Sequence, residues 1–89
     1  MRAGIPEPEL NAEVHLPGGI VHPDMVWRER LVAVEYEGDG HRDREQFVYD
    51  VGRYERMQAA GWTVVRVLPD DLRGALAEQL IRRVRSLLL

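Results

Sequence analysis

The sequence contains no cysteine and no lysine. Without cysteine, disulfides and thiolate metal ligands are excluded, and the chain suits the reducing cytoplasm, where we expect it. All twelve basic residues are arginine, so any mechanism that requires a lysine is excluded. No apolar run approaches the roughly 20 residues that span a bilayer, and the first residues lack the apolar segment of a signal peptide. We therefore expect a protein without membrane contact.

The length and charge of the chain restrict its organisation. Its 89 residues provide room for one domain with a modest core, so we expect a single domain over residues 1–89. The net charge of −3 argues against a protein that coats DNA. This charge is unevenly distributed, because residues 1–41 carry −5 and residues 42–89 carry +2. The acidic excess therefore lies in the half that contains the candidate site.

The hydrophobic pattern predicts three strands, a helix, a fourth strand and a second helix. Runs rich in β-branched residues are typical of strands, and apolar residues at helical spacing are typical of helices. We expect strands at residues 12–16, 20–27, 30–37 and 62–68, a helix at residues 42–60 that ends at Gly61, and a last helix after Pro69-Asp70-Asp71. Grouped strands followed by helices mixed with one further strand indicate an α/β layer architecture.

Two carboxylates form the main chemical signal, provided that Arg28-Glu29 is a two-residue hairpin turn. That turn would place Asp24 opposite Ala33, and Asp24, Ala33, Glu35 and Glu37 would share one face of the hairpin. Asp24 and Glu35 would then be diagonal neighbours, about 7–8 Å apart at the backbone. A slip of one residue in the turn would put them on opposite faces.

Several acids on one face of an apolar hairpin repel each other, and a divalent cation removes this repulsion. Mg²⁺ prefers hard oxygen ligands, commonly one or two carboxylates together with water and substrate phosphate. Such an ion can polarise a phosphodiester. The alternative is structural: the acids are solvated at the end of the strand or are paired with arginine.

Longer motifs point to a family. Pro23-Asp24, ten further residues and then Glu35-Tyr36-Glu37 resemble the PD-(D/E)XK nuclease signature. The run from Val34 to His41, followed by Asp50-x-x-Arg53 and the run from Ala60 to Arg66, resembles a bacterial family of endonuclease-like domains. That family is related to the very-short-patch mismatch-repair endonucleases. The similarity covers nearly the whole chain.

The resemblance implies a fold, an activity and a set of site residues. The fold would be restriction-endonuclease-like, with an approximately four-stranded mixed sheet and two main helices in the order β-β-β-α-β-α. The activity would be hydrolysis of DNA phosphodiester bonds with Mg²⁺ or Mn²⁺. The implied catalytic residues are Asp24, Glu35, Glu37 and His41. The implied metal ligands are Asp24, Glu35 and the Tyr36 carbonyl, and the implied supporting polar network is Asp50, Arg53 and Arg66.

Two departures from the family pattern favour a second hypothesis. Glu37 occupies the position of the signature lysine, where it would act as a further ligand or base while His41 takes part of the lysine role. Relatives carry an N-terminal helix before the segment that matches residues 3–6, and this chain begins almost at that segment, as a fragment of a longer protein would. The alternative function is therefore a catalytically degenerate nuclease-like module that binds DNA or a protein partner without turnover.

Other candidates have structural alternatives. Asp50 and Arg53, spaced i,i+3, would contribute only about 0.2–0.5 kcal/mol as a helix surface pair. His41 could be a simple helix-start residue, although the resemblance favours a functional role. The final Leu87-Leu88-Leu89 suggests an apolar contact between two copies of the chain, so we include a homodimer among the expected assemblies.

Overall fold

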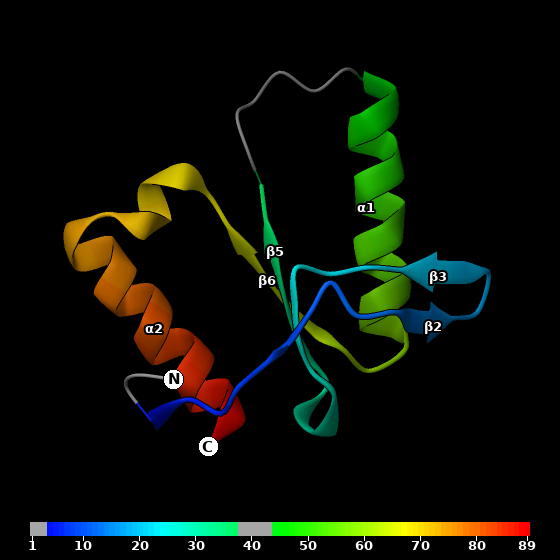
Figure 1. Ribbon diagram of the computed structural model, residues 1–89. Coiled ribbons are helices and arrows are strands. Elements are labelled where there is room, and N and C mark those ends of the chain that lie inside the picture. The colour runs from blue at the N-terminus through cyan, green and yellow to red at the C-terminus, as the bar shows by residue number, and fades with distance from the viewer. Residues whose placement is uncertain (1–3, 38–43) are drawn as a thin grey trace.

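The computed structural model describes residues 4–37 and 44–89, which form a mixed sheet with a helix on each side (Figure 1). The strands are β1 (Glu9–Leu10), β2 (Val14–Leu16), β3 (Gly19–Val21), β4 (Met25–Trp27), β5 (Val32–Tyr36) and β6 (Thr63–Val67). The helices are α1 (Arg44–Ala59) and α2 (Gly74–Leu88), and short 3-10 turns span Arg28–Arg30 and Pro69–Leu72. His41, a predicted catalytic residue, lies outside the described residues.

The main sheet has four strands in the order β1-β4-β5-β6, and β2 and β3 form a separate two-stranded sheet. Strands β4 and β5 are antiparallel, whereas β5 and β6 are parallel and are connected through α1. Parallel neighbours need such a crossover connection, which explains why a helix separates two strands that lie side by side. The predicted α/β class, the mixed four-stranded sheet and the two helices are therefore confirmed.

The predicted strand inventory before α1 is wrong in detail. We expected one continuous strand at residues 20–27, but β3 ends at Val21 and β4 begins at Met25. Pro23 lies in the gap, and proline cannot donate a hydrogen bond to a strand ladder. The break frees β3 to pair with β2 alone, while the short strand β1 pairs with β4 at the edge of the main sheet.

The predicted two-residue turn at Arg28-Glu29 is also wrong. Arg28–Arg30 form a 3-10 turn, and Leu31 closes it in the left-handed conformation with φ 54°. Trp27 therefore pairs with Val32 and Met25 with Val34, a register two residues away from the predicted one. Because side chains alternate with a period of two, this shift leaves every side chain of the hairpin on its predicted face.

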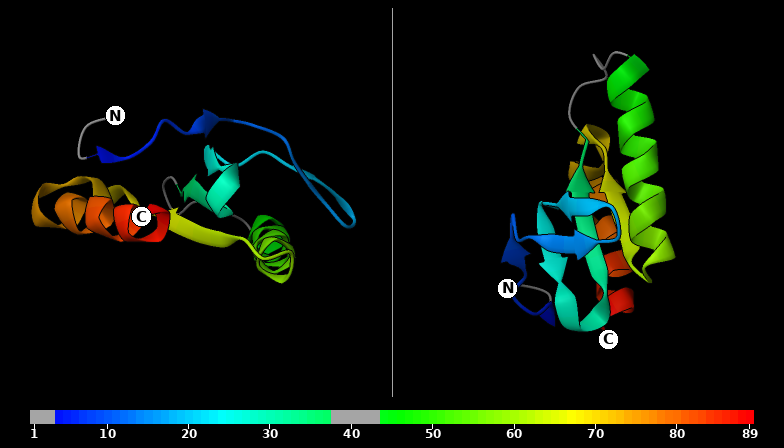
Figure 2. Two further views of the ribbon diagram at one scale, coloured as in Figure 1. Left: turned by 90° about the horizontal axis from the view of Figure 1, so that it is seen from below. Right: turned by 90° about the vertical axis from the view of Figure 1, so that its right-hand side faces the viewer.

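Two apolar clusters fill the two sides of the sheet. Figure 2 shows α1 and α2 lying on either side of β6. The cluster under α2 consists of Ile5, Trp27, Val32, Val34, Val65, Val67, Val84 and Leu88. The cluster under α1 and the β2–β3 hairpin consists of Val14, Leu16, Val21, Val26, Ala33, Met57 and Trp62. Strands β4, β5 and β6 alternate between them, as strands covered on both faces require, whereas both residues of β1 are exposed.

The helix ends follow local signals. Helix α1 ends at Ala59, and Gly61 takes a positive φ of 94°, which agrees with the predicted stop. The last helix begins later than expected, because Pro69–Leu72 form a 3-10 turn in which Asp71 Oδ2 accepts the Leu68 N–H at 2.8 Å. Within the described ranges, no helix has the length and apolar character needed to cross a membrane.

Candidate functional site

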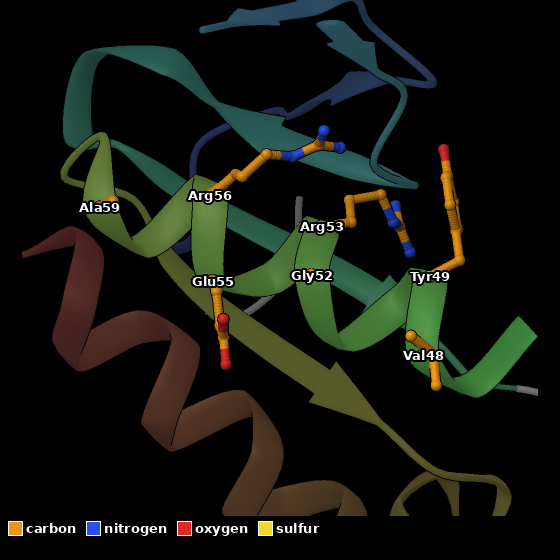
Figure 3. Close-up of a pocket in the computed structure, with 7 residues that line it drawn as sticks. All are labelled: Val48, Tyr49, Gly52, Arg53, Glu55, Arg56 and Ala59. Carbon is orange, nitrogen blue, oxygen red and sulfur yellow. The ribbon is translucent and has the colours of Figure 1, made fainter. Parts of the chain in front are cut away.

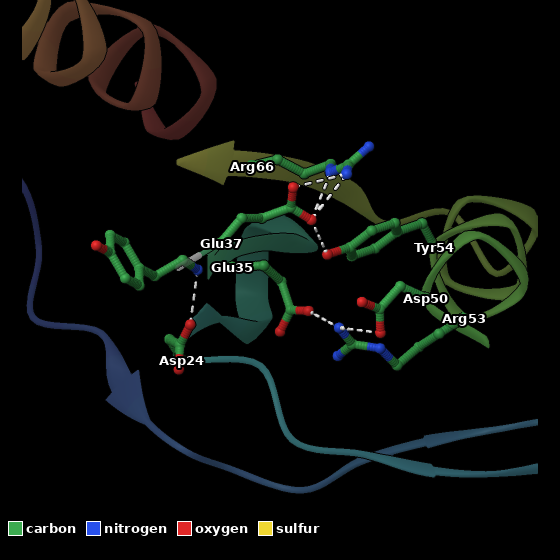
Figure 4. Close-up of polar contacts among 8 residues, drawn as sticks. Asp24, Glu35, Glu37, Asp50, Arg53, Tyr54 and Arg66 are labelled. Atoms are coloured by element: carbon green, nitrogen blue, oxygen red, sulfur yellow. Dashed lines mark hydrogen bonds and ion pairs between the residues drawn. The ribbon is translucent and has the colours of Figure 1, made fainter. Parts of the chain in front are cut away.

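Asp24 and Glu35 lie opposite each other where β4 and β5 end. Met25 pairs with Val34, so the next position outward in the same register brings Asp24 opposite Glu35. The predicted partner of Asp24 was Ala33. The Tyr36 N–H donates a hydrogen bond to Asp24 Oδ2 at 2.7 Å (Figure 4). Within the described part of the chain, Asp24 Oδ1 accepts no hydrogen bond. The Asp24 carboxylate is thus oriented by the backbone and keeps one oxygen available.

Glu35 points toward α1, where an arginine holds it. Only 4% of Glu35 is exposed, and its Oε2 forms an ion pair with Nη2 of Arg53 (Figure 4). The same Nη2 atom lies 3.8 Å from Asp50 Oδ1, one helical turn earlier. Arg53 therefore lies between two acidic side chains. Asp50 is 7% exposed, so the alternative of an Asp50–Arg53 pair on the helix surface is wrong.

Burial dominates the electrostatics of this pair. Burial raises the pKa of Glu35, whereas the hydrogen bond and the charge of Arg53 lower it. The charges of Asp24 and Asp50 raise it further, so the pKa of Glu35 stays above its ordinary value. Burial alone would lower the pKa of Arg53, but the hydrogen bond and charge of Glu35 outweigh it and raise that pKa. Arg53 is therefore a permanent cation beside Glu35.

Glu37 is held by a second set of donors on the same face. The Tyr54 hydroxyl donates to Glu37 Oε1 at 2.6 Å, and Arg66 Nη2 contacts Oε1 at 2.8 Å and Oε2 at 2.7 Å. The Arg66 guanidinium also lies over the Tyr54 ring, 4.5 Å from its centroid. Burial and then the hydrogen bond to Glu37 raise the pKa of Tyr54 to about 12. The carboxylate at the position of the signature lysine thus acts as an acceptor for protein donors.

The structure brings most of the predicted site residues together. Glu35 and Glu37 share the face of the sheet that is turned toward α1, and their partners come from α1 and β6. Asp24 lies at the position opposite Glu35, and its partner is the backbone of β5. Arginine pairing of the acids, which was the structural alternative, is observed for Glu35 and Glu37. Tyr36 contributes its backbone N–H to Asp24, and a ligand role for its carbonyl stays a prediction.

Sequence reasoning missed Tyr54. It lies within the helix predicted at residues 42–60 and was given no role there, and its ring is buried at 7% exposure. Its hydroxyl nevertheless donates a hydrogen bond to Glu37, the residue at the position of the signature lysine. A usable signal was present, because Tyr54 follows Arg53 directly and lies four residues after Asp50, on the same face of the helix.

The donor set was compared with the needs of a divalent cation. Asp24 and Glu35 offer hard carboxylate oxygens from adjacent strands, which suits an ion that takes one or two carboxylates and fills its remaining positions with water and phosphate. The described residues contain no group of three or more His, Cys, Asp or Glu side chains arranged to hold a metal. The residues therefore fit a site with two protein carboxylates, and Arg53 competes for one of them.

Comparison with known proteins finds similarity in Mycobacterium tuberculosis. Proteins from two strains, each described only as an uncharacterised protein, are 34% identical to this chain over 86 residues. The alignment covers 91% of this chain but only 32% of each relative, so the chain spans about a third of the length of these relatives. No family model matches the chain, and no solved structure matches it.

Proposed function

We propose that this domain is a metal-dependent, restriction-endonuclease-like nuclease domain that hydrolyses DNA phosphodiester bonds, with Asp24 and Glu35 as ligands for Mg²⁺ or Mn²⁺. The observation that carries the proposal is the placement of these carboxylates opposite each other, at the ends of adjacent strands and on one face of the sheet. A four-stranded mixed sheet with two helices, in which β4–β5 is antiparallel and β5–β6 is parallel, supports the proposal, because the motif resemblance implies a mixed sheet of about four strands with two main helices.

Each site residue has a defined task in this proposal. The Tyr36 N–H orients Asp24, and Arg53 orients Glu35 from the opposite side. Pre-oriented ligands bind a cation with less loss of side-chain freedom. A bound divalent cation would polarise the phosphodiester and promote ionisation of the attacking water. Glu37 keeps Arg66 in place beside the site rather than acting as a free base.

A second candidate function is a degenerate nuclease-like module that binds DNA without cleaving it. The observation that favours it is the pairing of two of the three acids with protein cations: Glu35 with Arg53 and Glu37 with Arg66. In such a module, the arginines would replace the metal permanently. Since the chain spans about a third of its relatives, the activity of the whole protein is a further part of the proposal.

Calorimetric titration of Mn²⁺ and Mg²⁺ separates the two candidates. We expect the wild-type domain to bind one cation, and Asp24→Asn and Glu35→Gln each to lose this binding because both remove a charged ligand. Asp24→Asn keeps an oxygen that can accept the Tyr36 N–H, so the fold should persist. Glu78→Gln removes an exposed acid of α2 by the same chemical change and serves as the control.

The outcomes point in different directions. Binding that survives in both variants and falls in Glu78→Gln would contradict the assignment of Asp24 and Glu35. The absence of binding in the wild-type domain, with DNA association that persists in EDTA and without cleavage, would favour the degenerate module. Circular dichroism of each variant distinguishes loss of a ligand from loss of the fold.

A further inference from the structure

A second surface region lies along α1, beside the candidate metal site. A hollow of about 520 Å³ is lined by Val48, Tyr49, Gly52, Arg53, Glu55, Arg56 and Ala59. Three of these side chains, Tyr49, Arg53 and Arg56, project from one side of the helix, whereas Val48 and Glu55 point to the other side (Figure 3). This side of α1 therefore presents two guanidinium groups and an aromatic ring together.

Arg56 is the unusual member of this group. In residues 4–37 and 44–89 its side chain forms no ion pair and no hydrogen bond, and its Nε atom is buried without an acceptor. Its Nη1 atom lies near the β2–β3 turn, 3.7 Å from where a Cβ on Gly18 would stand. A partly buried cation without a partner loses hydration that nothing replaces. An anion in the hollow would pair with the Nη groups of Arg56, whose charge no acidic side chain of the described residues balances.

Arg53 connects the hollow to the carboxylates. Its Nη2 atom is paired with Glu35, but its Nε atom is also buried without an acceptor. Arg53 and Arg56 are three residues apart, so their Cα atoms differ by about 4.5 Å along the helix axis. An anion held by Arg56 would therefore lie one helical turn from the residue that holds Glu35.

The other lining residues suit a nucleic-acid strand. Tyr49 is 57% exposed, and an exposed aromatic ring can stack on an unpaired base. Gly52 leaves the helix surface open between the ring and Arg56, since a Cβ at this position would meet nothing within 4 Å. Arginine binds phosphate oxygens with two parallel hydrogen bonds, which suits a backbone phosphate.

We propose that Arg56 binds a backbone phosphate of single-stranded DNA and that Tyr49 stacks on an adjacent base, so that this hollow leads the strand toward Asp24 and Glu35. This inference rests on the proposed function, because it takes DNA as the substrate and names the surface that binds it. It adds a strand-binding site that is distinct from the metal ligands.

Fluorescence anisotropy of a labelled single-stranded oligonucleotide, measured in EDTA, tests the site without any metal. We expect Arg56→Gln to weaken binding about threefold or more and to reduce the slope of log K against log salt by about one. Tyr49→Ser should weaken binding about fivefold or more through lost stacking. Arg56→Lys keeps the charge and should lose less affinity than Arg56→Gln. Arg82→Gln removes an exposed arginine of α2 and is the matched control.

Equal losses in Arg56→Gln and Arg82→Gln would overturn the proposal, because binding would then follow net charge alone. Inorganic phosphate that binds Arg56 as tightly as the oligonucleotide would overturn the strand site and leave a small-anion site. Absence of oligonucleotide binding by the wild-type domain would also overturn it. The calorimetric metal titration contains no DNA, so its failure is separate from any of these results.

Discussion

The two faces of β5 are built from different chemistry. On the face toward α2, Val32 and Val34 pack in a cluster whose members are all apolar, including Val84 and Leu88. On the face toward α1, Ala33 is followed by two acids that are almost fully buried. Strand β5 thus contributes only apolar residues to the core on the α2 side. On the α1 side it contributes Ala33 to an apolar cluster and Glu35 to a charged interior, which Glu37 extends one residue past the strand.

The difference separates stability from function. Burial of apolar surface stabilises a fold by about 25 cal/mol per Å², and the α2 face obtains this gain without any buried charge. Burial of an ion pair costs desolvation that often exceeds the attraction between the charges. A face that keeps Glu35 and Arg53 together is therefore not the most stable arrangement available to this chain. This asymmetry favours a functional role for the α1 face.

Arg53→Met should have the largest effect, because it leaves Glu35 buried without its cation. We expect a loss of about 3–5 kcal/mol in the free energy of unfolding. If Asp24 and Glu35 bind a divalent cation, excess Mn²⁺ should restore part of this stability, since a ligand that binds only the folded state stabilises it. Urea denaturation in EDTA and in Mn²⁺ measures both effects.

The double variant Arg53→Met with Glu35→Met sharpens this result. It replaces the Glu35–Arg53 pair by apolar side chains, so it should recover most of the lost stability and should not respond to Mn²⁺. Asp50 still lacks the nearby charge of Arg53, so the recovery should be incomplete. Arg66→Met removes the cation beside Glu37 and leaves Glu35 paired, so it controls for a general loss of positive charge. If the free energy of unfolding of Arg53→Met equals that of the wild type within error, the Glu35–Arg53 ion pair does not contribute to stability.

Leu88→Ala tests the opposite face and should have the next largest effect. Leu88 is 2% exposed within the apolar cluster under α2. Removal of its side chain should lower the free energy of unfolding by about 3 kcal/mol, from lost burial and the cavity left behind. This loss should be the same in EDTA and in Mn²⁺, as measured by urea denaturation. A loss that depends on Mn²⁺ would mean that the two faces are energetically coupled and would contradict their separation into a stabilising face and a functional face.

The order of elements could be predicted because local patterns determine it. The β-branched run of β5 and the glycine after α1 each give a clear signal, and both agree with the structure. The placement of Asp24 and Glu35 on one face was also predicted, although the turn was wrong. It survived because the register error was two residues, an even number, and a side chain changes face only with an odd shift.

The remaining features depend on contacts that no local pattern encodes. The chain breaks at Pro23 between β3 and β4, and β3 then pairs with β2 in a separate sheet. The sequence pattern does not show with which strand β3 pairs. The roles of Arg53 and Tyr54 depend on how α1 sits over β5, which brings residues 17 or 18 positions apart into contact. Sequence spacing indicated that Asp50 and Arg53 are neighbours but gave no sign that a third group, Glu35, completes the set.

Tyr54→Phe should have the smallest effect, because it removes one hydroxyl and keeps the ring under Arg66. Loss of the hydrogen bond to the Glu37 carboxylate should cost about 1.5 kcal/mol near neutral pH. The pKa of Tyr54 rises from 10.0 to about 12 in the folded state. Between these values the unfolded chain loses the phenolic proton while the folded chain keeps it, so this contribution is complete below pH 10 and is lost as the pH rises toward 12.

The wild type should therefore lose more stability than Tyr54→Phe between pH 9 and pH 12, and the difference between the two proteins should shrink across this range. Urea denaturation at a series of pH values measures it, and the other tyrosines titrate in both proteins and cancel. A constant difference would show that Tyr54 keeps an ordinary pKa. The charged interior beside α1 would then be more open to solvent than the apolar face.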